Sequence, residues 1–177
     1  MSVEINGAML GSFVNACVVH EFLMEEKIRA LIDLPPSEEL HKMWYPLAQY
    51  QLLCDSIEKM YQDSKPIFER IGQEMVRIWY NYGPGKEIVS SSIDFLKYQV
   101  SSDGYYSLVK GESEIIGEFK LEFIDEENGI ALIKSSTPLN RYVELGVLLG
   151  GLKLFKQTLF ANVTISESDN FFFLEFH

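Results

Sequence analysis

The clearest hydrophobic pattern in the chain lies in its C-terminal third. Residues 117–123 alternate apolar and charged side chains with the period of two that is typical of a half-buried strand. Residues 125–129 follow and end in Asn128-Gly129, a pair that supplies positive φ angles in tight turns. Residues 130–133 are apolar again. The pattern therefore predicts a β-hairpin that begins this part of the chain.

A second hairpin is predicted close to the C-terminus. Residues 161–165 and 171–176 are its two strands, and the polar segment 166–170 is its turn. Between the two hairpins, Pro138 precedes a long apolar stretch that predicts a helix from about 139 to 159. The order hairpin, helix, hairpin predicts a small antiparallel sheet with one helix laid on it.

The chain upstream of this unit is predicted to be helical. Apolar residues recur at helical spacing within 7–34, 47–61 and 65–82, and less regularly within 88–99. The third helix has the most regular apolar face, which includes Trp79, so we expect Trp79 to be buried. The fold class is therefore α+β, with N-terminal helices packed on a sheet built as hairpin-helix-hairpin. We expect one domain over residues 1–177, helical to about 111 and ββαββ from about 115.

Composition and charge narrow the classes of function. Hydrophobic residues make up 47% of the chain, and 26 acidic against 15 basic residues give a net charge of −11. Nucleic-acid affinity comes mostly from phosphate neutralisation, so the charge disfavours a nucleic-acid partner. Cys17 and Cys54 sit on apolar helical patterns and are expected to be buried free thiols. The apolar run 8–24 is interrupted by polar residues, which argues against a signal peptide or membrane span and favours a cytoplasmic protein.

No catalytic or metal-binding pattern emerges from the sequence. The glycines match neither a P-loop nor a dinucleotide-binding fingerprint. The three histidines, His20, His41 and His177, lack metal-ligand spacing, so no metal site is expected. The acidic run 112–127 is interpreted as the solvated face of a strand. We therefore nominate no catalytic residue and no cofactor, and we do not expect an enzyme.

Two glycines lie within the predicted C-terminal helix. Gly146 and Gly150 are four residues apart and therefore share one face of the helix. A glycine in a helix interior destabilises the helix by about 1 kcal/mol relative to alanine. Such a face lets a neighbouring backbone approach closely. The neighbour is either the chain's own sheet or the same helix of a second copy. We expect a homodimer with its interface drawn from helices, and Gly146 and Gly150 are the interface candidates.

Aromatic-rich helices over a sheet can enclose an apolar ligand or a dry core. The pocket candidates combine apolar bulk with a few polar groups, and they are Phe13, Cys17, His20, Trp44, Tyr50, Met75 and Trp79.

The order of elements, with the apolar helix segment 145–152 between two hairpins, resembles one broad superfamily. Its members include the haem-based nitric-oxide/oxygen sensor (H-NOX) domains, the 4-vinyl-reductase-like ligand-binding domains and the TRAPP vesicle-tethering subunits. Residues 44–50 (Trp-Tyr-Pro-Leu-x-x-Tyr) and 68–74 are similar to a family of small stand-alone bacterial proteins in that superfamily. The resemblance spans most of the chain and implies an H-NOX-like or 4-vinyl-reductase-like fold.

The chain departs from the motifs that hold cofactors in this superfamily. A histidine ahead of the first hairpin binds the haem iron in H-NOX domains, but no histidine lies between His41 and His177 here. The Tyr-x-Ser-x-Arg motif that holds the haem propionates is also missing from residues 135–139, and Tyr105 with Ser107 matches only half of it. The cysteines that bind zinc in phenol-sensing relatives are absent from the closing hairpin. The resemblance therefore implies a module without haem or zinc.

These observations lead to two hypotheses of different classes. The first is a bacterial cytoplasmic sensory or regulatory module that binds a small apolar ligand and signals through a protein partner. The alternative is an interaction or assembly module that resembles TRAPP subunits and needs no ligand.

Overall fold

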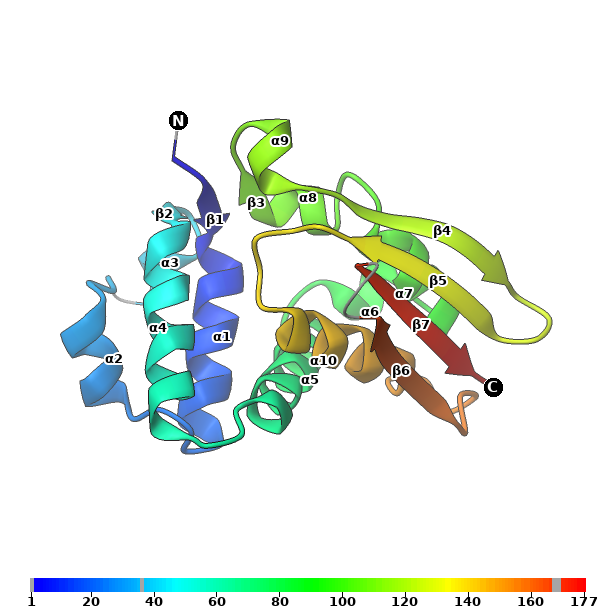
Figure 1. Ribbon diagram of the computed structural model, residues 1–177, viewed down its shortest axis with the longest axis horizontal. Helices are drawn as coiled ribbons and strands as arrows, with labels where there is room; N and C mark the ends of the chain where they lie inside the picture. Colours follow the sequence, from blue (N-terminus) through cyan, green and yellow to red (C-terminus); the bar gives the residue numbers. More distant parts are fainter. Residues whose placement is uncertain (1, 36, 167–169) are drawn as a thin grey trace.

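The computed structural model describes residues 2–35, 37–166 and 170–177, and most of its helices precede the C-terminal sheet along the chain (Figure 1). The elements in chain order are β1 (Glu4–Asn6), α1 (Gly7–Val19), α2 (Glu25–Leu31), α3 (Ser37–Leu40), β2 (Trp44–Pro46), α4 (Leu47–Met60), α5 (Lys65–Tyr82), α6 (Gly85–Ile88), α7 (Ser92–Gln99), α8 (Tyr105–Leu108), β3 (Val109–Lys110), α9 (Ser113–Ile116), β4 (Phe119–Asp125), β5 (Ile130–Ser135), α10 (Arg141–Leu152), β6 (Ala161–Ser166) and β7 (Phe171–Phe176).

The C-terminal sheet has the predicted antiparallel architecture. Its strand order is β4-β5-β7-β6, and both hairpins form where the alternating pattern places them. Gly129 has a φ of 62°, as the Asn-Gly turn requires. The predicted turn of the second hairpin falls partly on residues 167–169, which lie outside the described residues. The α+β fold class is confirmed.

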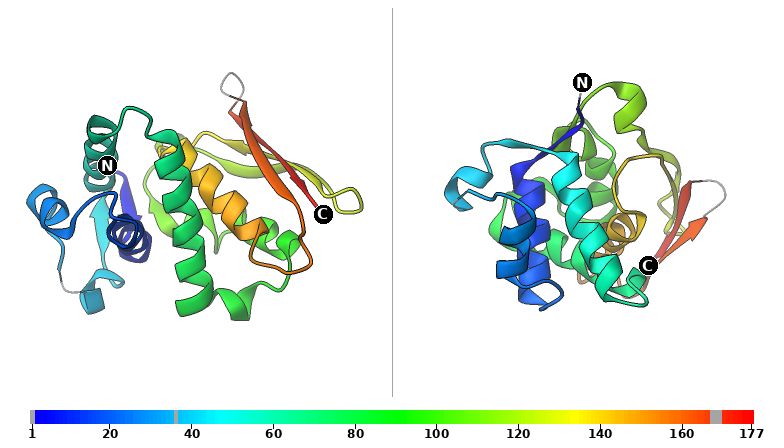
Figure 2. Two further views of the ribbon diagram at one scale, coloured as in Figure 1. Left: turned by 90° about the horizontal axis from the view of Figure 1, so that it is seen from below. Right: turned by 60° about the vertical axis from the view of Figure 1, so that its left-hand side comes forward.

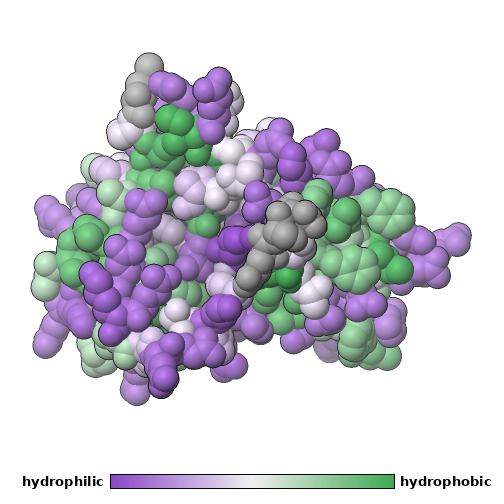
Figure 3. Space-filling model, viewed as in Figure 1, coloured by the Kyte–Doolittle hydropathy of each residue, from purple (hydrophilic) through white to green (hydrophobic). Residues whose placement is uncertain are grey.

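One face of this sheet is buried and the other faces solvent. Ala131, Ile133, Phe172 and Leu174 alternate along β5 and β7 and are fully buried on the inner face. α10 and α7 contact the sheet from that side. The outer face carries apolar surface, which Figure 3 shows over the C-terminal sheet at the right of the view. The period-two pattern therefore separates two faces, but both of them contain apolar residues.

Helices α5 and α10 form the most extensive helix–helix contact of the fold. α10 begins at Asn140, whose side chain accepts hydrogen bonds from the backbone N–H groups of Tyr142 and Val143. It ends at Leu152, earlier than the expected end near residue 159, because the chain turns after Lys153 and enters β6. α5 extends to Tyr82 and ends before Gly83, as predicted.

The mid-helix glycines lie against α5 of the same chain. A Cβ atom on Gly146 would overlap the backbone carbonyl of Glu69, and one on Gly150 would lie 2.8 Å from the Cα atom of Gln73. On the α5 side, a Cβ atom on Gly72 would overlap the backbone of Val143. The close neighbour of these glycines is therefore neither the sheet nor a second copy, because α5 already occupies the space.

The N-terminal helices form a layer of their own. α1 packs on α5, and the figures show α1, α2 and α4 on the side of α5 and α10 that is remote from the C-terminal sheet (Figures 1 and 2). Among the helices that precede the C-terminal sheet, α7 contacts it directly, whereas α1, α2 and α4 lie beyond α5 and α10. A small sheet in the order β2-β1-β3 ties this layer together, and the sequence patterns did not predict it.

Candidate ligand cavity

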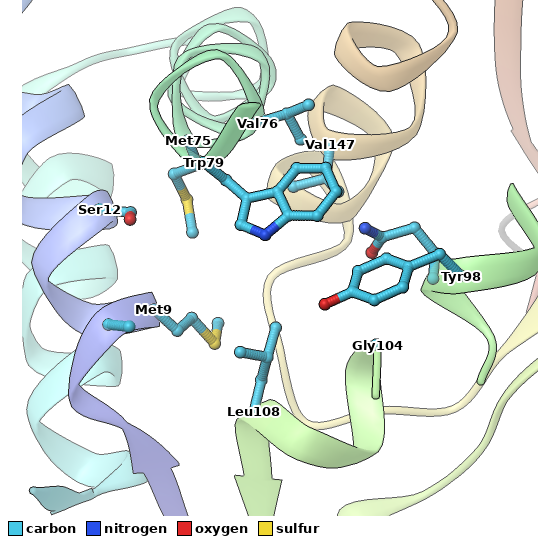
Figure 4. A pocket seen from close by; sticks show the side chains of 11 residues that line it. Met9, Ser12, Met75, Val76, Trp79, Tyr98, Gly104, Leu108 and Val147 are labelled. Atoms are coloured by element: carbon cyan, nitrogen blue, oxygen red, sulfur yellow. The ribbon is translucent and has the colours of Figure 1, made fainter. Parts of the chain in front are cut away.

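A cavity of about 130 Å³ lies where the N-terminal layer meets α10. Residues from α1, α5, α7, α8 and α10, together with the loop before α8, line it (Figure 4). Most of the lining is apolar, and its members are Ala8, Met9, Ser12, Met75, Val76, Trp79, Tyr98, Gln99, Gly104, Leu108 and Val147.

Helical spacing brings the lining residues of α5 together. Met75 and Trp79 are four residues apart and therefore lie on the same face of the helix. The Trp79 ring stacks on Tyr98 at the end of α7, with ring centroids 5.2 Å apart and an interplanar angle of 20°. Trp79 is half-buried, because one side of its ring faces the cavity. The expectation that Trp79 is buried is therefore corrected: its ring packs against the core but is only half-buried.

Trp79 and Tyr98 each direct a polar group towards the cavity. In Figure 4 the indole nitrogen of Trp79 and the hydroxyl of Tyr98 both face its interior. Burial, and to a lesser extent the negative charge of Asp103, raises the pKa of Tyr98. The phenol therefore keeps its proton at neutral pH. Both groups can donate a hydrogen bond to an acceptor atom of a guest molecule.

A smaller cavity of about 60 Å³ lies next to the first, and the two share Met9, Met75, Gln99, Leu108 and Val147. Its distinctive residue is Glu144 on α10, which is buried. The carboxylate accepts hydrogen bonds from the hydroxyls of Ser135, at 2.9 Å, and Thr137, at 2.6 Å. Burial raises the pKa of Glu144 from 4.5 to about 7, although these hydrogen bonds and Arg141 favour the charged form.

The raised pKa of Glu144 predicts a pH dependence of stability. The folded chain binds the Glu144 proton more tightly than the unfolded chain, so this group's contribution is fully present below about pH 4.5 and is lost as pH rises towards 7. Between these pH values, Glu144 lowers the unfolding free energy by at most about 1.4 kcal/mol per pH unit. Urea denaturation between pH 5 and 8 should show a steeper loss of unfolding free energy in the wild type than in Glu144→Gln. Parallel curves for the two proteins would contradict the assignment.

Two of the seven pocket candidates, Met75 and Trp79, line the cavity. The structure places the other five elsewhere. Phe13 and Cys17 are fully buried on α1, and Phe13 packs edge-on against Tyr50 of α4, with centroids 4.9 Å apart. The Tyr50 hydroxyl accepts a hydrogen bond from the backbone N–H of Asn140. These residues fill the core between helices, so their bulk does not border open space.

The remaining candidates lie at the edges of the N-terminal layer. His20 follows the last turn of α1, stacks on Phe22, and its Nε2 lies 3.5 Å from the Glu74 carboxylate. Trp44 lies in β2, with the Lys110 ammonium 5.7 Å from its ring centroid. Cys17 and Cys54 are buried free thiols, as expected, and burial raises the pKa of both.

Sequence reasoning missed Met9, Tyr98, Gln99 and Leu108. Met9 is a buried apolar residue of α1, and nothing in its spacing along the sequence distinguishes a cavity wall from the packed core. Tyr98 ends the less regular helix predicted over 88–99, and its contact with Trp79 is made between distant parts of the chain. A stacked pair of this kind leaves no local signal in the sequence.

Solved structures share this architecture. An unliganded Fe(II) H-NOX protein mutant from K. algicida aligns with 98% of this chain and 97% of its own, with a TM-score of 0.67 and 16% identity. An oxygen-binding H-NOX domain related to soluble guanylate cyclases, in its oxygen complex, aligns with 97% of this chain and 95% of its own, with a TM-score of 0.62 and 12% identity. This chain has an H-NOX-like fold. No protein-family model and no curated protein matches the sequence.

The residues around these two cavities of the H-NOX-like chain do not fit a haem. Cavities of about 130 and 60 Å³ are smaller than the roughly 300 Å³ that sites for drug-sized ligands reach, and a haem is larger still. None of the three histidines lines either cavity, and neither does any arginine or lysine that would pair with the propionates. Within the described part of the chain, no group of three His, Cys, Asp or Glu side chains is placed to hold a metal ion. The same residues contain no helix with the length and hydropathy of a membrane span.

Proposed function

We propose that this chain is a cytoplasmic, non-enzymatic sensory or regulatory module that binds a small apolar ligand without haem or zinc and signals through a protein partner. The observation that carries the proposal is the apolar cavity at the junction of the two layers, with Trp79 and Tyr98 directing donors into it. The H-NOX-like fold supports a ligand-binding function by analogy, since one of the compared structures is an oxygen complex.

The cavity defines the class of ligand. Its volume of about 130 Å³ is close to that of an engineered apolar cavity of about 150 Å³ that binds benzene or xenon in another protein. The ligand is therefore the size of a single aromatic ring or a short aliphatic molecule. A carbonyl, ether or hydroxyl oxygen on it would accept hydrogen bonds from Trp79 and Tyr98.

The position of the cavity supports regulation. A guest would contact Met9 of α1, Trp79 of α5 and Val147 of α10, which belong to different layers of the fold. A ligand changes a conformational equilibrium only through contacts that differ between the two states. If the two layers move relative to each other, the contacts of a guest that touches both layers change. A protein partner bound to either layer would then bind the two arrangements with different affinity.

Native mass spectrometry tests whether a ligand is present. Protein purified from cells under gentle conditions should carry a co-purifying molecule of one ring's size, lost on denaturation. Val147→Phe, which fills the cavity from α10, should carry none while keeping a wild-type circular dichroism spectrum. The proposal would be contradicted if wild-type protein from several growth conditions showed the mass of the polypeptide alone, as Val147→Phe is expected to do.

Haem reconstitution tests the cofactor part of the proposal. Wild-type protein mixed with ferrous haem should give no Soret band typical of five-coordinate histidine ligation, because no histidine lines either of the two cavities at the junction of the layers and none lies between His41 and His177 in the sequence. A stoichiometric complex that His20→Ala abolishes would overturn this expectation. A complex that persists in His20→Ala and binds through another residue would equally contradict a haem-independent module.

A ligand-free assembly module is the second candidate function. The observation that favours it is the outer face of the C-terminal sheet, where Phe123 and Phe173 are 53% and 40% exposed. Large exposed apolar side chains gathered on one face are typical of protein–protein contacts.

A further inference from the structure

The smaller of the two cavities at the junction of the layers contains a carboxyl group in its wall. Glu144 is only 6% exposed and lines this cavity of about 60 Å³. The other walls are mostly apolar or aromatic and include Tyr105 and Phe119. A water molecule needs roughly 10–15 Å³ of such space, so the cavity has room for a small polar head group with a neighbouring methylene. A guest that enters this cavity therefore meets a buried acid.

The hydrogen bonds described for Glu144 leave part of its carboxylate without a donor. The Thr137 hydroxyl donates to Oε1 at 2.6 Å. The Ser135 hydroxyl carries one hydrogen, and its oxygen lies 2.9 Å from Oε2 and 3.2 Å from Oε1. An ionised carboxylate offers about four acceptor positions, so these two hydroxyls fill about half of them.

No cation of the described residues is paired with Glu144. The ion pairs that the described residues form do not include it. Arg141 precedes it by one turn of α10, but its Nη2 donates to the backbone carbonyl of Ser166 at 3.0 Å and its guanidinium lies over the ring of Phe172. A buried carboxylate without a cationic partner is costly, so a bound cation would stabilise the charged form of Glu144.

We propose that the ligand of this module is a small primary amine, bound as its ammonium ion. This inference rests on the proposed function and deepens it by naming the class of ligand. The ammonium group lies in the smaller cavity and donates to Glu144, while the apolar body fills the larger cavity beside Trp79 and Val147. The two cavities share part of their lining, so one molecule spans both.

An ammonium ion matches this cavity better than the alternatives do. It supplies three hydrogens for the unfilled acceptor positions, together with the missing positive charge. Aromatic rings attract ammonium ions, and Tyr105 and Phe119 line the same cavity. An alcohol would supply one hydrogen and no charge. A metal ion needs more ligands, and the described residues contain no group of three His, Cys, Asp or Glu side chains that could hold one.

Amine binding should depend on pH through Glu144. Burial raises the pKa of Glu144 to about 7, so the free protein carries this proton in about nine-tenths of molecules at pH 6 and in about one-tenth at pH 8. The ammonium ion has to displace the proton, which should make amine affinity about tenfold higher at pH 8 than at pH 6.

The other ionisable groups that act on Glu144 do not change charge over this range. They are Arg141 on α10, Tyr50 on α4 and Tyr105 on α8. Burial raises the pKa of both phenols, so each keeps its proton at pH 6 and at pH 8. Arginine stays charged throughout. The expected pH dependence is therefore that of Glu144 itself.

Isothermal titration calorimetry with two probes tests the proposal. The probe 2-phenylethylamine carries the ammonium group, and 2-phenylethanol is a neutral molecule of similar shape. At pH 8 the wild type should bind the amine at least about tenfold more tightly than the alcohol, because its hydrogen bonds to Glu144 are charge-assisted. At pH 6 the amine should bind about tenfold more weakly and release about one proton to the buffer. The affinity for the alcohol should change less than about threefold, since its binding displaces no proton.

Two glutamine variants identify the responsible carboxyl group. Glu144→Gln keeps the size of the side chain and removes its charge, so it should bind the amine no more tightly than the alcohol and lose the pH dependence. Glu74→Gln is the matched control, because Glu74 is also buried but lines neither cavity and is already paired with Arg77. It should keep the wild-type preference. Circular dichroism checks the fold of both variants, and proton release by the wild type is a measure that needs no variant.

The outcomes separate this inference from the proposed function. Equal affinities of the wild type for the two probes would overturn the amine ligand alone, and so would a co-purified molecule without an amine nitrogen. A preference that survives in Glu144→Gln or is lost in Glu74→Gln would also overturn it, as would amine binding without proton release at pH 6. If neither probe binds, the inference fails, and native mass spectrometry then decides the proposed function independently.

Discussion

Gly146→Ala should destabilise the fold by roughly 3 kcal/mol or more. The new Cβ atom would overlap the backbone carbonyl of Glu69, and backbone of a packed helix cannot move aside as a side chain can. Relief requires α5 and α10 to separate, which weakens the most extensive helix–helix contact in the fold. Urea denaturation monitored by circular dichroism measures the effect.

Gly11→Ala is the matched control for this prediction. Gly11 also lies inside a helix, but the atom nearest to a Cβ there would be the Cδ2 atom of Leu40, at 2.8 Å, the flexible end of a side chain. Alanine also gains about 1 kcal/mol of helix propensity over glycine, so the net change should stay within about 1 kcal/mol of wild type. Equal effects of the two substitutions would show that α5 and α10 are not in close backbone contact.

Phe95→Ala should destabilise the fold by about 3–5 kcal/mol, the usual cost of truncating a buried phenylalanine. Phe95 is fully buried on α7, where it fills the space beside Gly151 of α10 and lies 6.3 Å from the Trp79 ring. The same substitution removes the support behind the cavity wall. Tryptophan fluorescence should therefore shift to the red in the folded state as well.

Tyr82→Ala provides the comparison for Phe95→Ala. Tyr82 is 79% exposed at the end of α5, so its truncation should change the unfolding free energy by no more than about 0.5 kcal/mol. Phe95→Ala with a cost near that of Tyr82→Ala would mean that α7 does not pack on α10 as described.

The C-terminal sheet could be predicted because its signal is local. Alternation over residues 117–123 and the Asn128-Gly129 turn determine a strand and a reversal without reference to the rest of the chain. The strand positions were accurate to within about two residues. The end of α10 could not be predicted accurately, because apolar residues beyond Lys153 continue the hydrophobic pattern after the helix has ended.

The small N-terminal sheet shows the limit of local reasoning. Its strands are two or three residues long and come from positions 4–6, 44–46 and 109–110. Each is too short to show a period of two, and their pairing depends on how the helices between them pack. The residues before α1 and before α4 therefore gave no strand signal.

The candidate site could be predicted only in part for a related reason. Met75 and Trp79 were identified because α5 has a regular apolar face, but that face is mostly core. Whether an apolar residue borders a cavity depends on how well its neighbours fill space, which is a property of the whole packing arrangement. The same limit applies to Gly146 and Gly150. Their spacing indicates that a neighbouring backbone approaches α10 closely, but only the structure identifies that neighbour as α5.

Crystals pressurised with xenon test the central claim, that the junction of the two layers holds a cavity able to accept an apolar guest. Xenon enters apolar cavities of this size, so anomalous scattering should locate it between Met9, Trp79 and Val147. Val147→Phe crystals treated in the same way should show no peak there. An interior without xenon in the wild type, or a peak that Val147→Phe leaves unchanged, would contradict the account.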